Sequence, residues 1–226
     1  MGEKSLHDAI KCWYACSDDK LETEIGEYII DIVRGNMLIE IQTRNFSAIK
    51  TKLRNLVRHN PIRLVHPIAQ KKWIIRVDID GKTILSRRKS PIKGRVEDLF
   101  SELVYIPTMV KNPNFSLEVL LIRSEQILIN DGQGSWRRKG WSIHDQRLLN
   151  VVSRVTFSNP SNFHVLLPAA LSKVFTSRDL AKALNLSLNK ARKMAYCLRH
   201  MGAVQVVGKR GQALIYTLSQ ELMHTP

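Results

Sequence analysis

Residues 28–43 read Tyr-Ile-Ile-Asp-Ile-Val-Arg-Gly-Asn-Met-Leu-Ile-Glu-Ile-Gln-Thr, an almost wholly apolar run that contains two acids. The Gly-Asn pair at residues 35–36 is typical of the two-residue loop that closes a β-hairpin. A hairpin closed there has the register Val33 with Leu38, Asp31 with Glu40, and Ile29 with Gln42. Because side chains alternate between the two faces of a strand, this register predicts that Asp31, Glu40 and Gln42 share one face.

The opposite face of the hairpin is predicted to be buried, because it is built from Ile30, Ile32, Ile39 and Ile41. Two carboxylates directly opposite each other repel and weaken a sheet. A divalent cation between them removes that penalty, and Mg²⁺ prefers carboxylate oxygens as ligands. The alternative is that Asp31 and Glu40 are ordinary solvated residues on the outer face of a hairpin, since motifs this short recur by chance.

The elements around the hairpin complete a simple order. Leu6, Ile10 and Trp13 recur at helical spacing between residues 3 and 16, and the polar residues 17–19 end that helix. Residues 21–24, 28–33 and 38–43 are predicted strands, residues 48–57 a helix, and residues 62–66 a strand that ends at Pro67. Residues 1–67 are therefore predicted to run helix, three strands, helix, strand.

This order and the Asp31…Glu40-x-Gln42 pattern resemble the PD-(D/E)XK nuclease superfamily, in which an acid on the second strand precedes Glu-x-Lys on the third. The resemblance implies that Asp31 and Glu40 bind Mg²⁺ or Mn²⁺, and that Gln42 orients the attacking water. It also implies that Glu3 is the helical acid of the site, with His7 one turn further on. Gln42 cannot carry the positive charge of the usual lysine, and either Lys50 or Lys52 in the next helix could supply that charge instead.

The segment from residue 68 to residue 150 is predicted to elaborate this core. Residues 73–78 and 82–85 are predicted to form a hairpin that turns at residues 80–81, and residues 87–95 a basic loop. A helix over 96–105 and strands over 116–122 and 126–129 are expected to follow. A second basic loop over 132–140 and a helix over 146–153 then lead to the last domain.

Residues 160–222 carry the pattern of two helices and a hairpin. Thr176 and Asp179 are predicted to cap a helix, Ser187 to cap a second helix that ends at Gly202, and residues 204–207 and 213–217 to form a hairpin with a basic tip. This pattern resembles a winged helix-turn-helix domain, whose second helix enters the major groove of DNA. The predicted DNA-binding residues are Asn189, Lys190, Arg192 and Lys193 on that helix and Lys209 and Arg210 at the tip. The alternatives are a merely solvated basic face or a contact with protein.

The excess of Lys and Arg over Asp and Glu indicates a polyanionic partner. The 226 residues carry a net charge of +15, and such an excess favours phosphate through counterion release. No stretch approaches the roughly 20 apolar residues that cross a bilayer, and Glu3 and Asp8 do not suit a signal peptide. The three cysteines lack C-x-x-C spacing, so we expect a reducing cytoplasm, with Cys12 and Cys16 as small core residues.

Taken together, the sequence predicts an α/β (α+β) protein of two domains. Residues 1–150 form a restriction-endonuclease-like core with elaborations, and residues 159–226 form a winged helix. The predicted function is a metal-dependent DNA endonuclease that its last domain targets to DNA. The alternatives are a non-catalytic DNA-binding regulator that retains the nuclease-like scaffold, and a protein that binds or processes RNA. The predicted partners are DNA, or else RNA, and a second copy of the chain, but no membrane.

Overall fold

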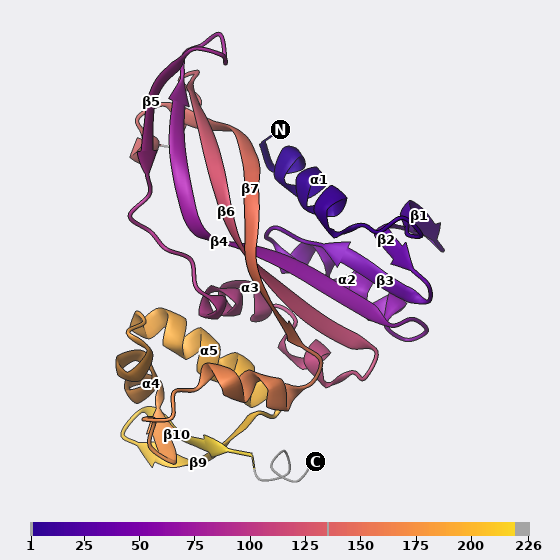
Figure 1. Cartoon of the computed structure of the whole chain (residues 1–226). Helices are drawn as coiled ribbons and strands as arrows, with labels where there is room; N and C mark the ends of the chain where they lie inside the picture. Colours follow the sequence, from indigo (N-terminus) through magenta and orange to yellow (C-terminus); the bar gives the residue numbers. More distant parts are fainter. Residues whose placement is uncertain (1, 135, 220–226) are drawn as a thin grey trace.

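A computed structural model describes residues 2–134 and 136–219, and of residues 2–4 and 137 it describes the backbone alone. The protein is α+β, with one sheet of seven strands and a second sheet of three (Figure 1). The large sheet has the strand order β1-β2-β3-β4-β6-β7, and β5 pairs with β4 outside this path. The small sheet has the order β8-β10-β9.

The first six elements confirm the order predicted for residues 1–67. They are α1 (Gly2–Tyr14), β1 (Lys20–Ile25), β2 (Tyr28–Arg34), β3 (Met37–Ile41), α2 (Phe46–Leu56) and β4 (Ile62–Val77). Strands β1, β2 and β3 are antiparallel neighbours, whereas β3 pairs with β4 in parallel. The predicted pairing of Val33 with Leu38 is confirmed, and Gly35 has the positive φ of +57° that this tight turn requires.

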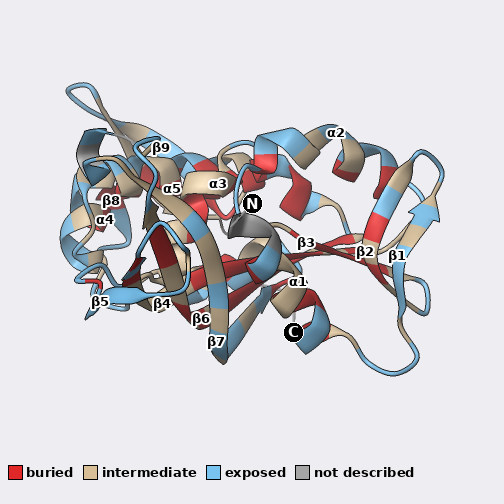
Figure 2. Cartoon of the chain, turned by 90° about the horizontal axis from the view of Figure 1, so that it is seen from above, coloured by how far each residue is buried: buried red, intermediate tan, exposed pale blue. Residues whose placement is uncertain are grey.

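Helices α1 and α2 cover opposite faces of this part of the sheet (Figure 2). Ile32, Ile39 and Ile41 are buried in the cluster that includes α1, as an amphipathic hairpin predicts. Ile30 is equally buried, but it packs in the larger cluster on the α2 side. The prediction of a single isoleucine face is therefore wrong at Ile30. At Ile30 strand β2 is paired with β1 alone, because the β2–β3 ladder begins at Ile32 and Ile39.

Strand β4 corrects the predicted end of a strand at Pro67, because it continues without a break to Val77. The carbonyls of Pro61 and Val65 accept hydrogen bonds from the N–H groups of Leu38 and Gln42. The backbone N–H and C=O groups of every second residue of β4 therefore face β3. Pro67 belongs to this set, and β3 has already ended at its level. The missing N–H of Pro67 therefore removes no bond of the ladder.

Two long strands replace several predicted elements. The strands predicted at 116–122 and 126–129 form one strand, β6 (Phe115–Asn130), and the helix predicted at 146–153 is wrong, because this segment lies within β7 (Trp141–Phe157). Leu148 and Val151 share apolar contacts on the α1 side, and shifts in the β6–β7 register bring both to that side. Together with β5 (Ile84–Lys89), the far halves of β4, β6 and β7 extend past α1 as a twisted arm (Figure 1).

Short helical turns fill the space below the sheet. The helix predicted at 96–105 is divided into a 3₁₀ turn, η1 (Val96–Leu99), and one α-helical turn, α3 (Phe100–Leu103). A further 3₁₀ turn below the sheet is η2 (Pro107–Lys111), whereas η3 (Trp136–Arg138) lies in the connection between β6 and β7. The first three residues of the predicted basic loop at 87–95 lie in β5, and the loop itself begins after Lys89.

The last part of the chain contains the predicted helices and hairpin together with one added strand. Its elements are η4 (Pro160–Leu166), β8 (Val174–Thr176), α4 (Ser177–Leu184), α5 (Leu188–Met201), β9 (Val204–Arg210) and β10 (Ala213–Leu218). Thr176 and Asp179 form a reciprocal capping box at α4, and the Ser187 side chain caps α5. Gly202 ends α5 in a left-handed conformation with φ +84°.

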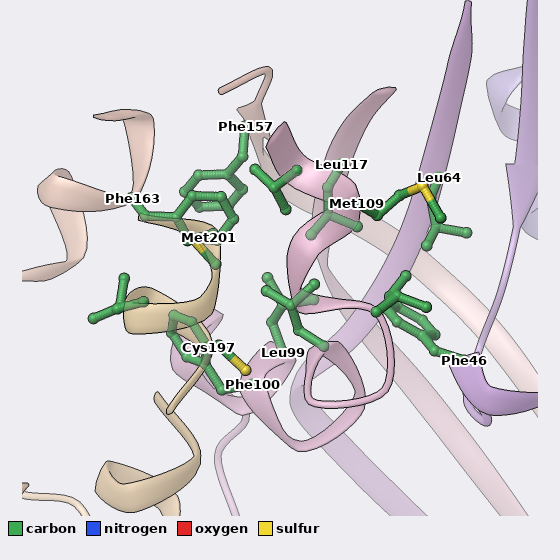
Figure 3. Packing of buried hydrophobic residues seen from close by; sticks show 14 of the residues in the cluster. Phe46, Leu64, Leu99, Phe100, Met109, Leu117, Phe157, Phe163, Cys197 and Met201 are labelled. Carbon is green, nitrogen blue, oxygen red and sulfur yellow. The ribbon is translucent and has the colours of Figure 1, made fainter. Parts of the chain in front are cut away.

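One apolar cluster joins this last part to the large sheet. Phe163 of η4 stacks on Phe157 of β7 with ring centroids 4.2 Å apart, and it also lies against Phe100 of α3. Cys197 and Met201 of α5 are buried in the same cluster (Figure 3). Helix α5 is therefore packed directly on the elements below the sheet.

Two further predictions concern the cysteines and the membrane. Cys12 and Cys16 are exposed, so the prediction that they are core residues is wrong, whereas Cys197 is buried. No helix in the described part of the chain is both long enough and apolar enough to span a membrane.

Candidate functional site

A cavity of about 710 Å³ lies at the point where β2 and β3 separate. Helix α1 contributes His7, Asp8 and Lys11 to its wall, and β2 contributes Ile29 and Asp31. Glu22 of β1 and the segment from residue 41 to residue 45 complete the lining. The cavity is therefore the place where predicted site residues from α1 and β2 meet.

Asp31 is held at this cavity by two hydrogen bonds to its Oδ2 atom. His7 Nε2 lies 3.2 Å away, and the backbone N–H of Ile41 donates across 2.8 Å. Burial acts to raise the pKa of Asp31, but the bonds from His7 and Ile41 outweigh it and hold that pKa below its usual value. The hydrogen bond to Asp31 in turn raises the pKa of His7. The pair therefore favours a carboxylate beside a protonated imidazole.

Glu40 is buried, and a lysine from α2 neutralises it. Lys52 Nζ lies 2.7 Å from each carboxylate oxygen of Glu40 and donates a further bond of 2.6 Å to the carbonyl of Ile29. Burial, and next the negative charge of Asp31, raise the pKa of Glu40, whereas Lys52 opposes that rise. Of the two lysines considered from the sequence, Lys52 is the one that contacts Glu40, and Lys50 lines a different pocket.

Gln42 does not contact either acid. Its side-chain amide donates to the backbone carbonyls of Arg44 and Asn45, and so closes the loop that follows β3. The three residues predicted to share one face are thus directed to three places: Asp31 to α1, Glu40 to α2, and Gln42 to the loop. The physical reason is that the β2–β3 ladder does not extend to Asp31, so strict alternation no longer relates the two strands there.

The chemistry of these donors suits a hard divalent cation, although the set is small. Oxygen ligands from two carboxylates are the kind that Mg²⁺ and Mn²⁺ prefer, and no described residue hydrogen-bonds to Asp31 Oδ1. The oxygens of Glu40 are both engaged by Lys52. No cluster of three or more His, Cys, Asp or Glu residues is found among the described residues. Glu3 belongs to α1 one turn before His7, but its side chain lies outside the described residues.

The rim of the cavity contains a charged group that the sequence did not single out. Lys11 Nζ lies 2.6 Å from Glu22 and 3.6 Å from Asp8. Lys11 follows His7 by four residues, so helical spacing could have placed both on one face of α1. This network balances its charges, and the excess positive charge of the protein lies elsewhere.

A basic groove runs between α2 and α5. Lys50 and Arg54 of α2 and Arg58, two residues beyond its end, follow one another at intervals of four residues, and they line two adjoining pockets of about 200 and 440 Å³. Tyr196 and His200 of α5 line the first of these pockets from the other side. No carboxylate lines either pocket among the described residues. We refer to these five residues as the basic groove.

The predicted DNA-binding residues differ in their surroundings. Asn189 and Arg192 are exposed, Lys193 is half-buried, and Lys209 and Arg210 lie at the exposed end of β9. The ammonium of Lys190 instead forms an ion pair with Asp98 of η1. Close by, Arg95 donates a bond of 2.7 Å to the carbonyl of Leu184 at the end of α4. Lys190 therefore helps to hold α5 against η1.

Comparison with known proteins identifies a relative and a family. A protein of Treponema pallidum (strain Nichols), described as uncharacterized, is 27% identical over 218 residues, which are 95% of this chain and 84% of the relative. No solved structure matches the chain. A family model described as a domain of unknown function, DUF8091, matches residues 4–158, which extend from α1 to just past β7 and include the cavity. The match covers more than half of the chain, which therefore belongs to the DUF8091 family.

Proposed function

We propose that the protein is a metal-dependent DNA endonuclease of the PD-(D/E)XK type. One observation carries this proposal. The Lys52 ammonium is in contact with Glu40, and the negative charge of Asp31, which lines the cavity, acts on Glu40. A cation beside two acids is what the Asp…Glu-x-Lys arrangement provides, and here α2 supplies it in place of residue 42.

The arrangement of the elements supports the same proposal. Helix α1, the antiparallel strands β1 to β3, helix α2 and the parallel strand β4 follow the helix, three strands, helix, strand order that the resemblance implies. The acids lie on the second and third of these strands, at the point where the strands separate. Helices α4 and α5 and the β9–β10 hairpin similarly support a winged helix.

In this proposal Asp31 and Glu40 hold the cation, and when bound it supplies Lewis-acid activation of a water and of the scissile phosphate. Lys52 stabilises negative charge that develops on the phosphate, because its ammonium is already desolvated beside Glu40. His7 fixes the orientation of Asp31 and holds a proton at Nε2. Gln42 orders the loop after β3 and has no direct part in the reaction.

Nucleic acid is the substrate class that the charge supports. The net charge of +15 favours phosphate. The basic groove adds three cations that form no ion pair with another described residue to the exposed residues of α5 and of the β9–β10 tip. Tyr196 and His200 provide rings beside these charges. The groove is formed by both parts of the chain, so we propose that duplex DNA contacts both at once.

A second candidate function is a non-catalytic DNA-binding regulator that retains this scaffold. The observation in its favour is that Lys52 engages both oxygens of Glu40, and that Glu40 is absent from the lining of the cavity. A metal would have to displace one of these contacts. In a regulator the Lys52–Glu40 pair would be purely structural.

Two lysines of α2 distinguish these functions. We expect Lys52→Ala to lower the cleavage rate at saturating plasmid at least 10²-fold, because charge stabilisation is lost. Lys50→Ala is the matched control, since it lies in the basic groove and should weaken DNA binding while leaving the saturated rate unchanged. Metal-dependent nicking that is equally fast with Lys52→Ala would contradict the role of Lys52, and binding without any nicking by the wild type would favour the regulator.

A further inference from the structure

A second, smaller cavity adjoins the candidate site. It has a volume of about 160 Å³ and shares Thr43 and Arg44 with the larger cavity. Strands β4, β6 and β7 bring Lys72, Ser124 and Gln146 to its wall. The remaining lining is apolar and consists of Leu6, Pro67, Ala69 and Ile122.

Lys72 is the unusual member of this group. It is half-buried, and its ammonium has no ion pair or hydrogen bond with any other described residue. The lysines Lys11, Lys52 and Lys190 each contact a carboxylate. Burial without a counterion lowers the pKa of Lys72. A cation removed from water without a partner costs free energy, which a bound anion would offset.

The other polar groups of the cavity are also suited to an anion. Ser124 is only 3% exposed, and neither its hydroxyl nor the side-chain amide of Gln146 hydrogen-bonds to another described residue. Arg44 adds a second positive side chain to the wall. No carboxylate lines the cavity among the described residues. The cavity thus offers an ammonium, a hydroxyl and an amide that can all donate, within a space for a small ligand.

We propose that this cavity binds a phosphate group of the nucleic-acid strand, next to the phosphate that is cut. The identity of the ligand as nucleic acid rests on the proposed function, whereas the cavity and its unpaired donors do not. An internal phosphodiester and a terminal phosphate present the same oxyanion chemistry. A terminal phosphate would fix the distance between the strand end and the cut, and an internal one would only add affinity.

The test uses the full-length protein in EDTA, so that binding is measured without turnover. Inorganic phosphate and three oligonucleotides of one sequence, with a 5′-phosphate, with a 3′-phosphate and with neither, are titrated against the wild type, Lys72→Gln and Lys71→Gln. Lys71 is the matched control, because it neighbours Lys72 but does not line the cavity. We expect Lys72→Gln to weaken inorganic phosphate at least tenfold and Lys71→Gln to change it less than twofold. Thermal unfolding should show that Lys72→Gln is at least as stable as the wild type, since no contact of its ammonium is lost and a buried unpaired charge is removed.

The oligonucleotides then identify the source of the phosphate. A loss that is confined to one phosphorylated end supports a terminal phosphate, and an equal loss on all three supports an internal phosphodiester. Equal affinity of Lys72→Gln and the wild type for every probe would overturn the proposal. Cleavage does not enter these readouts, so a protein that binds in this way but never cuts would refute the proposed function and leave the phosphate site standing.

Discussion

Lys52 of α2 brings a positive charge to Glu40 from a backbone position other than residue 42. Residue 42 sits at the end of β3, and its side chain satisfies the loop carbonyls there. Helix α2 packs across the face that carries Glu40, so a lysine on the inner side of α2 meets that acid. Lys50 and Lys52 each lie three or four residues from a buried position of α2, and periodicity alone therefore could not choose between them.

We predict that Lys52→Met destabilises the metal-free protein by roughly 3–5 kcal/mol, because Glu40 is left buried without a partner. Burial already raises the pKa of Glu40, so Glu40 is protonated more readily in the folded protein than in the unfolded chain. Stability lost at pH 8 should therefore be regained as the pH falls through that raised pKa. Urea unfolding at pH 8 and pH 5 checks this prediction.

The matched variant for this experiment is Lys52→Met combined with Glu40→Gln. It removes both charges, so most of the lost stability should return at pH 8, and the part of the pH dependence that Lys52→Met adds to that of the wild type should disappear. A double variant that is as unstable as Lys52→Met would mean that packing, rather than the unpaired charge, caused the loss.

At the scale of elements, the sequence predicts turns and helix caps correctly, because these depend on neighbouring residues. It does not predict which distant strands pair. The Gly35 turn and the Thr176 cap depend on neighbouring residues, and the sequence predicts both correctly. The segment 146–153 has apolar residues three apart, which also suits a helix, and only its pairing with β6 makes it a strand. The side of the sheet toward which the Asp31 side chain is directed could not be predicted from the sequence either, because it depends on where the β2–β3 ladder ends.

The cap of α4 gives a prediction at this scale. The Thr176 hydroxyl oxygen accepts bonds from the N–H groups of Arg178 and Asp179, and the Asp179 carboxylate accepts one from the backbone N–H of Thr176. Thr176→Ala should therefore cost about 0.5–2 kcal/mol in the free energy of unfolding. Ser177→Ala, one residue further on, removes no capping bond and should cost less than half as much. Equal losses in urea unfolding would show that the cap does not stabilise α4.

At the scale of the whole molecule, the shared apolar cluster decides how the two parts behave. Phe163, Cys197 and Met201 come from the last part of the chain, and they pack with Phe100 and Phe157 (Figure 3). The ion pair of Lys190 with Asp98 crosses the same boundary. Separation of the parts would expose this cluster to water, so we expect them to unfold together.

The tryptophans allow that expectation to be measured. All four lie before residue 142, so fluorescence reports on the first part, whereas far-UV circular dichroism reports on the whole chain. Phe163→Ala should cost roughly 3–5 kcal/mol and shift both transitions by the same amount. A shift in circular dichroism alone would show that the last part unfolds independently.

The central claim is that Asp31 and Glu40 form a working metal-dependent site, and plasmid cleavage tests it most directly. Supercoiled plasmid is incubated with wild type, Asp31→Asn and the control Asp80→Asn, each with Mg²⁺, with Mn²⁺ and with EDTA. Asp80 lies in the exposed turn between β4 and β5, far along the chain from the cavity. We predict nicking by the wild type and Asp80→Asn with either metal, none with EDTA, and at least a 10²-fold slower rate for Asp31→Asn at unchanged DNA affinity. Nicking by Asp31→Asn at the wild-type rate, or no nicking by any form, would contradict the claim.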